Sequence, residues 1–142
     1  MPRGFVARAE TTIHAPAYRL WDALTDPALI KQYLFGTDVT TDWRVGSPIT
    51  YRGEWEGKQY EDKGTILECE PERLLVSTYW SSLSGKPDVP ENYNTVTYEL
   101  SDEGGGIKLT IVQDNNDSAE SAQHSEQNWN AVLARMKELL EQ

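Results

Sequence analysis

A long amphipathic helix at the C-terminal end of the chain is the feature that most constrains the fold. Apolar side chains recur there at the i, i+3, i+4, i+7 spacing that places them on one face of a helix. They are Trp129, Val132, Leu133, Met136, Leu139 and Leu140. Asp117, with Glu120 three residues later, resembles a capping box and predicts the start of the helix. From there about 24 residues, at about 1.5 Å each, predict a helix about 36 Å long that can cross a whole sheet.

The middle of the chain predicts that sheet. Between Asp38 and Gln113, strand-like runs are separated by short turn-rich pieces, which indicates hairpins and therefore an antiparallel meander. The predicted strands are residues 49–55, 60–69, 74–80, 93–100 and 107–113. The longest separator, residues 81–92, is either a mobile rim or a connector with no role.

The N-terminal part predicts one strand and two short helices. Residues 5–13 alternate with the period of a half-buried strand, and Pro16 ends that strand. Helices are expected over residues 17–24 and, with Pro27 near the first position, about residues 28–33. The 142 residues are the usual size for one core, so a single α+β domain over residues 1–142 is predicted.

Charge and composition exclude several classes of partner. Thirteen basic against 23 acidic residues give a net charge of -10, which repels nucleic acid and anionic membranes. The single Cys69 allows no intrachain disulfide. No apolar stretch reads as a signal peptide or a membrane span, so a cytoplasmic protein with neither a nucleic-acid nor a membrane partner is expected.

A change along the terminal helix predicts a pocket. On the face that carries Trp129, the preceding positions hold the small residues Ser118, Ala122 and Ser125, which leave space beneath the helix. Large rings with a few polar groups on the facing strands would line a ligand cavity there. The expected ligand-binding residues are Tyr51, Trp55, Trp80, Gln113, Ala122, Ser125 and Trp129. In that prediction Trp80 shares one face of its strand with Val76 and Thr78. The alternative is that the rings pack on one another and the helix start overhangs solvent.

Residues for catalysis are scarce. The two histidines, His14 and His124, are expected at the surface, and neither has a partner at metal-ligand spacing. The sequence shows no nucleophile elbow, so no catalytic residue, metal or cofactor is predicted. The predicted strands carry carboxylates, most of which should alternate outward, although a buried one could act as a base. They are Glu54, Glu61, Asp62, Glu68 and Glu99.

The order of elements and several short motifs resemble the SRPBCC or START-like superfamily, and within it the group similar to the activator of Hsp90 ATPase. The motifs are Ile13-His14-Ala15-Pro16 followed by Leu20-Trp21-Asp22-Ala23-Leu24-Thr25-Asp26-Pro27, residues 64–74, Thr95-Val96-Thr97-Tyr98-Glu99-Leu100, and Asn128-Trp129 before a Leu-rich end. The resemblance implies a helix-grip (Bet v 1-like) fold, with a curved antiparallel sheet of six or seven strands and a hydrophobic cavity under the terminal helix. Two positions depart from it: Ser47-Pro48 follows Gly46 where relatives have a Gly-Gly pair, and Gln113 stands where many relatives have His.

Three functions are compatible with these features, because a fold alone does not choose among them. The favoured one is noncatalytic binding of a small apolar or aromatic molecule in the cavity. The second is a cyclase- or hydrolase-type enzyme that uses the same cavity. The third is a protein-interaction module of the chaperone-regulator kind, with an unknown protein partner.

Overall fold

The computed structural model describes residues 3–142, and a seven-stranded sheet forms its centre. The strands are β1 (Phe5–Ile13), β2 (Asp38–Thr40), β3 (Pro48–Trp55), β4 (Lys58–Glu70), β5 (Leu74–Tyr79), β6 (Asn94–Glu103) and β7 (Gly106–Asn116). The helices are α1 (Ala17–Thr25), α2 (Pro27–Tyr33) and α3 (Ala119–Leu140), with a single 3-10 turn, η1, at Pro90–Asn92. The strands lie in the order β1-β7-β6-β5-β4-β3-β2, and every neighbouring pair is antiparallel.

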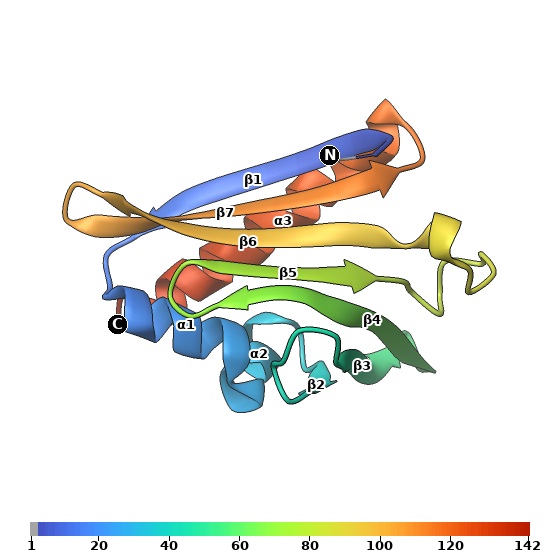
Figure 1. The fold of residues 1–142 in the computed structure, drawn as a ribbon, viewed down its shortest axis with the longest axis horizontal. Helices are drawn as coiled ribbons and strands as arrows, with labels where there is room; N and C mark the ends of the chain where they lie inside the picture. The colour runs from blue at the N-terminus through green and yellow to red at the C-terminus, as the bar shows by residue number, and fades with distance from the viewer. Residues whose placement is uncertain (1–2) are drawn as a thin grey trace.

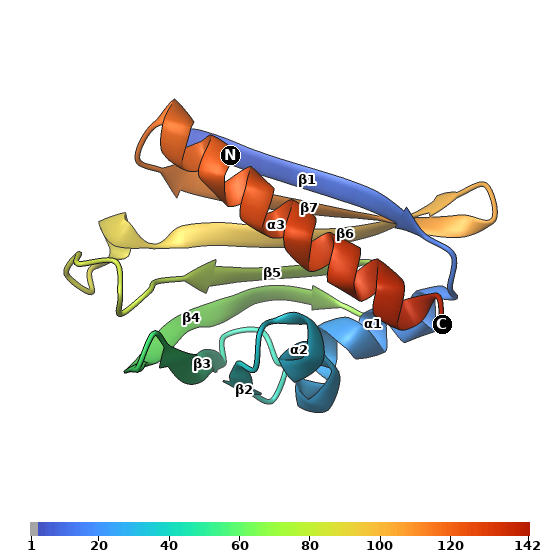
Figure 2. The same cartoon turned by 180° about the vertical axis from the view of Figure 1, so that it is seen from behind.

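Helix α3 lies diagonally across one face of the sheet. Figure 1 shows the sheet in front of the helix, and Figure 2 shows from behind how α3 runs from the β1–β7 edge to the two short helices. The predicted helix-grip fold is therefore confirmed, with seven strands. None of the helices formed by residues 3–142 is both long and apolar enough to cross a membrane.

The C-terminal half of α3 packs on a dry core. Val132, Leu133, Met136 and Leu140 are all buried, as the apolar pattern predicts. They meet sheet residues whose side chains are fully buried, among them Ile13, Leu109 and Ile111. Fully burying a side chain of this size stabilises the fold by about 1.5–3 kcal/mol, so this contact fixes the helix on the sheet.

The start of α3 differs from the prediction by one residue. Ser118, and not Asp117, is the N-cap, because its hydroxyl accepts a hydrogen bond from the Ser121 N–H at 3.0 Å. Asp117 lies just outside the helix and forms an ion pair with Lys86. Serine and aspartate cap helices about equally well, so the spacing alone does not separate the two positions. Strand β7 also continues three residues beyond the predicted end, to Asn116.

A tight hairpin joins β3 to β4 and sets the register of this corner of the sheet. Trp55 pairs with Lys58, which leaves only Glu56 and Gly57 in the turn. Both have positive φ, 48° and 80°, which is the requirement of a type I′ turn. The pairing continues through Tyr51 and Asp62, which lie opposite each other. The hairpin thereby brings the residues of one wall of a cavity together.

Candidate ligand-binding cavity

A cavity of about 620 Å³ lies between α3 and the sheet. This volume is within the range of about 300–1,000 Å³ that is typical of small-molecule sites. Seven of the lining side chains are aromatic: Phe35, Tyr51, Trp55, Tyr60, Tyr79, Tyr98 and Trp129. They come from the α2–β2 connection, from β3 to β6 and from α3, so the fold brings together rings that are far apart in the sequence.

Five of the seven residues singled out in the sequence line this cavity: Tyr51, Trp55, Gln113, Ser125 and Trp129. Trp80 and Ala122 do not belong to the lining. Ala122 is buried one helical turn before Ser125. Trp80 stacks on Tyr93 with 6.4 Å between ring centroids.

Trp80 lies outside the lining because the opposite face of β5 is turned toward the cavity. The sequence assignment placed Val76, Thr78 and Trp80 on the cavity side, but Tyr79 lines the large cavity and Ser77 lines a smaller one beside it. Successive side chains of a strand point to opposite faces, so an error of one residue assigns every side chain of the strand to the wrong face. In β5 the neighbouring residues Leu75 and Val76 are both buried, so both faces of the strand are covered. Such a strand lacks the alternation of apolar and polar residues that would identify the face toward the cavity.

A chain of hydrogen bonds fixes the wall under the start of α3. The Trp129 Nε1–H donates to Gln113 Oε1 at 2.8 Å, and the Gln113 side-chain amide donates to Asn116 Oδ1 at 3.1 Å. The Ser125 hydroxyl donates to the same Asn116 oxygen at 3.0 Å. The Tyr98 ring meets Trp129 edge-on, with centroids 5.9 Å apart. These contacts hold the indole ring in one orientation at the cavity surface.

The polar end of the cavity is built around a buried carboxylate. Asp62 is only 5% exposed and accepts hydrogen bonds from the Tyr79 hydroxyl, from the Ser82 N–H at 2.9 Å and from the Ser82 hydroxyl at 3.3 Å. Burial raises the pKa of Tyr79 far above its ordinary value, and the negative charge of Asp62 raises it further. Tyr79 therefore keeps its proton and serves as a donor to Asp62.

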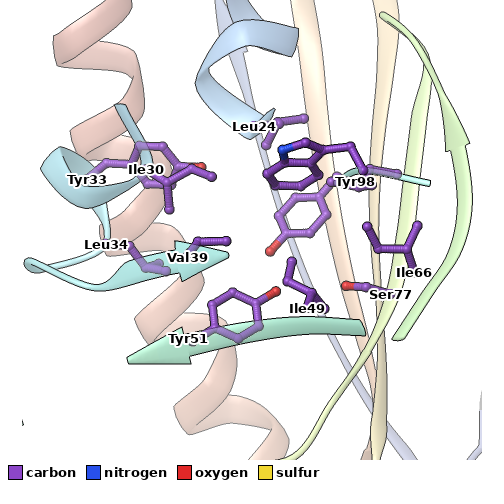
Figure 3. Close-up of a pocket in the computed structure, with 12 residues that line it drawn as sticks. Leu24, Ile30, Tyr33, Leu34, Val39, Ile49, Tyr51, Ile66, Ser77 and Tyr98 are labelled. Carbon is purple, nitrogen blue, oxygen red and sulfur yellow. The ribbon is translucent and has the colours of Figure 1, made fainter. Parts of the chain in front are cut away.

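Tyr51 extends this polar end toward α2. Its ring meets Tyr79 edge-on at 5.5 Å, and burial raises the pKa of Tyr51 to about 12, with the charge of Asp62 adding to the rise. A second, smaller cavity of about 30 Å³ adjoins it, lined in part by Tyr51, Ser77 and Tyr98. Figure 3 shows the hydroxyl groups of these three residues pointing into one space among the apolar side chains. Three polar groups around a volume of this size are the arrangement that holds a single water molecule.

The opposite wall depends on a glycine. Tyr60 lies across Gly53, where a Cβ atom would come within 2.4 Å of the Tyr60 hydroxyl oxygen. That hydroxyl is 2.7 Å from the Thr37 hydroxyl, which ties β4 to the segment before β2. Any side chain at position 53 would displace the Tyr60 ring. The absence of a side chain at Gly53 thus shapes the cavity.

The rim of the cavity is apolar and exposed. Phe35, Trp55 and Leu83 line it and are 63%, 61% and 45% exposed. Glu54, also exposed, stands beside Trp55 at the same mouth. Large apolar side chains gathered at the mouth of a hollow are typical of a binding site.

The remaining titratable groups lie elsewhere. His14 and His124 are exposed, as predicted. Among residues 3–142 no group of three or more His, Cys, Asp or Glu side chains is arranged to hold a metal ion. Partial burial raises the pKa of the Cys69 thiol, which lowers its reactivity. The chemistry that the cavity itself offers is one buried carboxylate, several tyrosine hydroxyls and aromatic faces.

The sequence interpretation missed Asp62, Tyr60, Tyr79 and Tyr98 as lining residues. Asp62 is one of five strand carboxylates of which the sequence predicts that most face outward, and it is the buried exception. One signal was available: Tyr51 and Asp62 lie opposite each other in the hairpin, so they share a face of the sheet. Counting back from the turn at Gly57 would have placed Asp62 on the cavity side with Tyr51.

Comparison with known proteins gives consistent results. The model of a family described as activator of Hsp90 ATPase homolog 1-like protein matches residues 14–141. The solution structure of ChR145 from Cytophaga hutchinsonii is 45% identical, with a TM-score of 0.86 over 99% of this chain and 97% of that one. The crystal structure of CV1439 from Chromobacterium violaceum is 24% identical, with a TM-score of 0.78 over 96% of this chain and 97% of that one. The Aha1 dimer from Colwellia psychrerythraea is 16% identical, with a TM-score of 0.75 over 96% of each chain. No curated protein is detectably similar in sequence.

Proposed function

The chain belongs to the family of activator of Hsp90 ATPase homolog 1-like proteins, a family built on the helix-grip fold, and from its cavity we propose that it binds a small apolar or aromatic molecule without transforming it. The observation that carries this proposal is the volume of about 620 Å³ lined by seven aromatic side chains. Rings of this kind each offer about 150–250 Å² of contact surface, and stacked or edge-on pairs add about 0.5–1.5 kcal/mol beyond burial.

The fixed geometry of the walls also supports binding. Trp129 is anchored through Gln113, and Tyr79 through Asp62, so the rings do not have to be ordered when a ligand enters. Immobilising a flexible side chain at an interface costs about 0.5–1.5 kcal/mol, and preformed walls avoid that cost. The exposed rim residues Phe35 and Trp55 give an apolar ligand its first contact.

A second candidate function, an enzyme that uses the same cavity, is favoured by one specific observation. Asp62 is a buried carboxylate that lines the cavity and is hydrogen-bonded to Tyr79. A carboxylate with a tyrosine donor is a combination that acid–base catalysis uses. We rank it second because Asp62 and Tyr79 are already hydrogen-bonded to each other, and Asp62 also accepts from Ser82, which suits a structural support as well.

A third candidate, a protein-interaction module, rests on the family name and on the exposed apolar rim. Phe35, Trp55 and Leu83 would then contact a partner protein. We rank it last, because the same residues surround the mouth of the cavity, where a small ligand also needs them.

The test is binding of N-phenyl-1-naphthylamine, an uncharged aromatic probe whose fluorescence rises in apolar surroundings. Ala131 lines the cavity and Ala134 does not, while both are exposed positions on α3. Ala131→Trp should fill part of the mouth and weaken probe binding about tenfold or more, since the added ring takes the place of the ligand. Ala134→Trp, the matched control, should change the affinity less than about twofold. Equal binding by both variants, or no saturable binding by the unmodified protein, would count against the proposal.

A further inference from the structure

The charges on the cavity wall all have one sign. The formally charged lining side chains are Glu54 at the mouth and Asp62 at the polar end, and among the described residues no Lys, Arg or His belongs to the lining. Two cations next to lining residues in the sequence are paired with acids that are also outside the lining, Arg52 with Glu61 at 2.5 Å and Lys63 with Asp88. A ligand in the cavity therefore meets negative charge without a compensating cation from the wall.

One cation, Arg135, lies next to a residue of the rim. The Arg135 guanidinium lies over the Phe35 ring, 4.7 Å from its centroid, and donates to the Gln32 carbonyl at 2.9 Å. It lines a separate polar depression beside Gln32 and Glu138. Arg135 thus covers one face of Phe35 and lines another depression, so it adds no positive charge to the lining of the cavity.

Asp62 keeps the capacity to accept another hydrogen bond. A carboxylate offers about four lone-pair positions. Its Oδ1 accepts from the Ser82 N–H and the Ser82 hydroxyl, and its Oδ2 accepts from the Tyr79 hydroxyl. Among the donors of the described residues, these three leave one position on Oδ2. A bound molecule with a donor group can use it.

The aromatic rings of the same cavity favour a positive charge as well. The faces of tyrosine and tryptophan rings carry partial negative charge and attract ammonium groups within about 6 Å. Tyr51, Tyr60, Tyr79 and Trp129 line the same cavity as Asp62. Burial raises the pKa values of Tyr51 and Tyr79, so their hydroxyls stay neutral and the rings keep the electron distribution that this attraction needs.

We infer that the cavity selects ligands with an aromatic or apolar body and a positively charged amine, and that it rejects ligands with a carboxylate. The ammonium group donates to Asp62 Oδ2 and lies against the tyrosine rings, while the apolar body contacts Tyr98 and Trp129. This inference rests on the proposed function and names the class of ligand for the same site. The negative charge of the wall determines specificity, because it repels an anionic ligand and attracts a cationic one.

The test uses three naphthalenes that differ only in the group on the same carbon: 1-naphthylmethylamine, 1-naphthylmethanol and 1-naphthoate. Each is titrated into the protein by calorimetry at pH 7 and one fixed ionic strength. We expect the amine to bind about tenfold more tightly than the alcohol, because charge-assisted hydrogen bonds are roughly twice as strong as neutral ones and the rings add cation–π attraction. The carboxylate should bind about tenfold more weakly than the alcohol, or not at all, because it meets like charge.

Substitutions then assign the selectivity to Asp62. Asp62→Asn keeps the shape of the side chain and should bring the amine and alcohol affinities within about threefold of each other. Asp102→Asn removes the same formal charge from an exposed position outside the cavity lining and should leave the ratio unchanged. Glu54→Gln at the mouth should reduce the ratio by about twofold, since exposed charges contribute little. It provides a second readout if Asp62→Asn does not fold.

The outcomes separate the two proposals. Equal affinities for the amine and the alcohol, or an unchanged ratio in Asp62→Asn, would overturn the selection of cations while the proposed binding function stands. Tighter binding of 1-naphthoate would overturn it as well. Failure of all three naphthalenes and of N-phenyl-1-naphthylamine to bind would overturn both.

Discussion

The two halves of α3 lie on the same sheet but are held there by different forces. The C-terminal half inserts large apolar side chains, such as Leu133 and Met136, which are buried to 1% exposure or less. The N-terminal half places Ser125 and Trp129 over a cavity and is held by hydrogen bonds to Asn116 and Gln113. One helix therefore provides both the dry core and one wall of a hollow. The difference shows how the fold can keep a cavity and remain stable: the apolar contacts that hold α3 on the sheet are concentrated in its C-terminal half, and the cavity lies under its N-terminal half.

The largest loss of stability is expected from substitutions in the C-terminal half of α3, which packs on the core. Leu133→Ala removes three heavy atoms from a close-packed site and should lower the free energy of unfolding by about 3 kcal/mol. In the cavity half, Ser125→Ala removes one hydrogen bond to Asn116 and should cost about 1 kcal/mol or less. Urea denaturation followed by circular dichroism measures both. Equal losses would show that the two halves do not differ in the way the structure indicates.

A smaller loss of stability is expected at high pH, from Tyr51 at the polar end of the cavity. The folded pKa of Tyr51 is about 12, above the ordinary value of 10.0, so its neutral form is favoured in the folded state. That contribution is complete below about pH 10 and is lost as the pH rises toward 12. Between pH 9 and pH 11 Tyr51 alone should account for a loss of about 1 kcal/mol in the free energy of unfolding.

Tyr51→Phe tests this assignment, because it removes the titrating group and keeps the ring. The variant should lose about 1 kcal/mol less than the unmodified protein between pH 9 and pH 11, as measured by urea denaturation at each pH. Tyr18→Phe is the matched control, since Tyr18 is 57% exposed and lies outside the cavity lining. An identical alkaline loss in Tyr51→Phe and the unmodified protein would contradict the assignment.

The fold was accessible from the sequence because its signals are periodic and redundant. Strand β1 has the predicted limits, and the apolar pattern from Val132 to Leu140 identified the buried face of α3. The family resemblance in the sequence added the order of elements. Each of these signals extends over several residues, so an error at one position does not change the conclusion.

The cavity was only partly accessible, because its polar end depends on single-residue choices. Trp80 was assigned to the inner face of β5 and Tyr79 was not, since apolar residues occupy both faces of that strand. Asp62 resembles any strand carboxylate until its partner Tyr79 is placed next to it by strand pairing. Pairing between β4 and β5 also contains a register shift between Ile66 and Glu68, which counting along the sequence does not reveal. Local patterns thus predict elements better than they predict which side chains meet.

The smallest change in the free energy of unfolding is expected from substitutions of Ser118 and Asp117, at the start of the N-terminal half of α3. Ser118→Ala removes the acceptor for the Ser121 N–H and should lower the free energy of unfolding by about 1 kcal/mol. Asp117→Asn removes only an ion pair with Lys86 that is exposed to solvent, and should cost less than about 0.5 kcal/mol. Urea denaturation in 0.1 M and 1 M NaCl separates the two causes, because salt screens the ion pair and leaves the cap in place. If Asp117→Asn proved the more costly substitution, with a loss that vanished at 1 M NaCl, the ion pair rather than the cap would hold this end of the helix. Because the N-terminal half of α3 makes few apolar contacts, its anchoring to the sheet depends on polar contacts of this size.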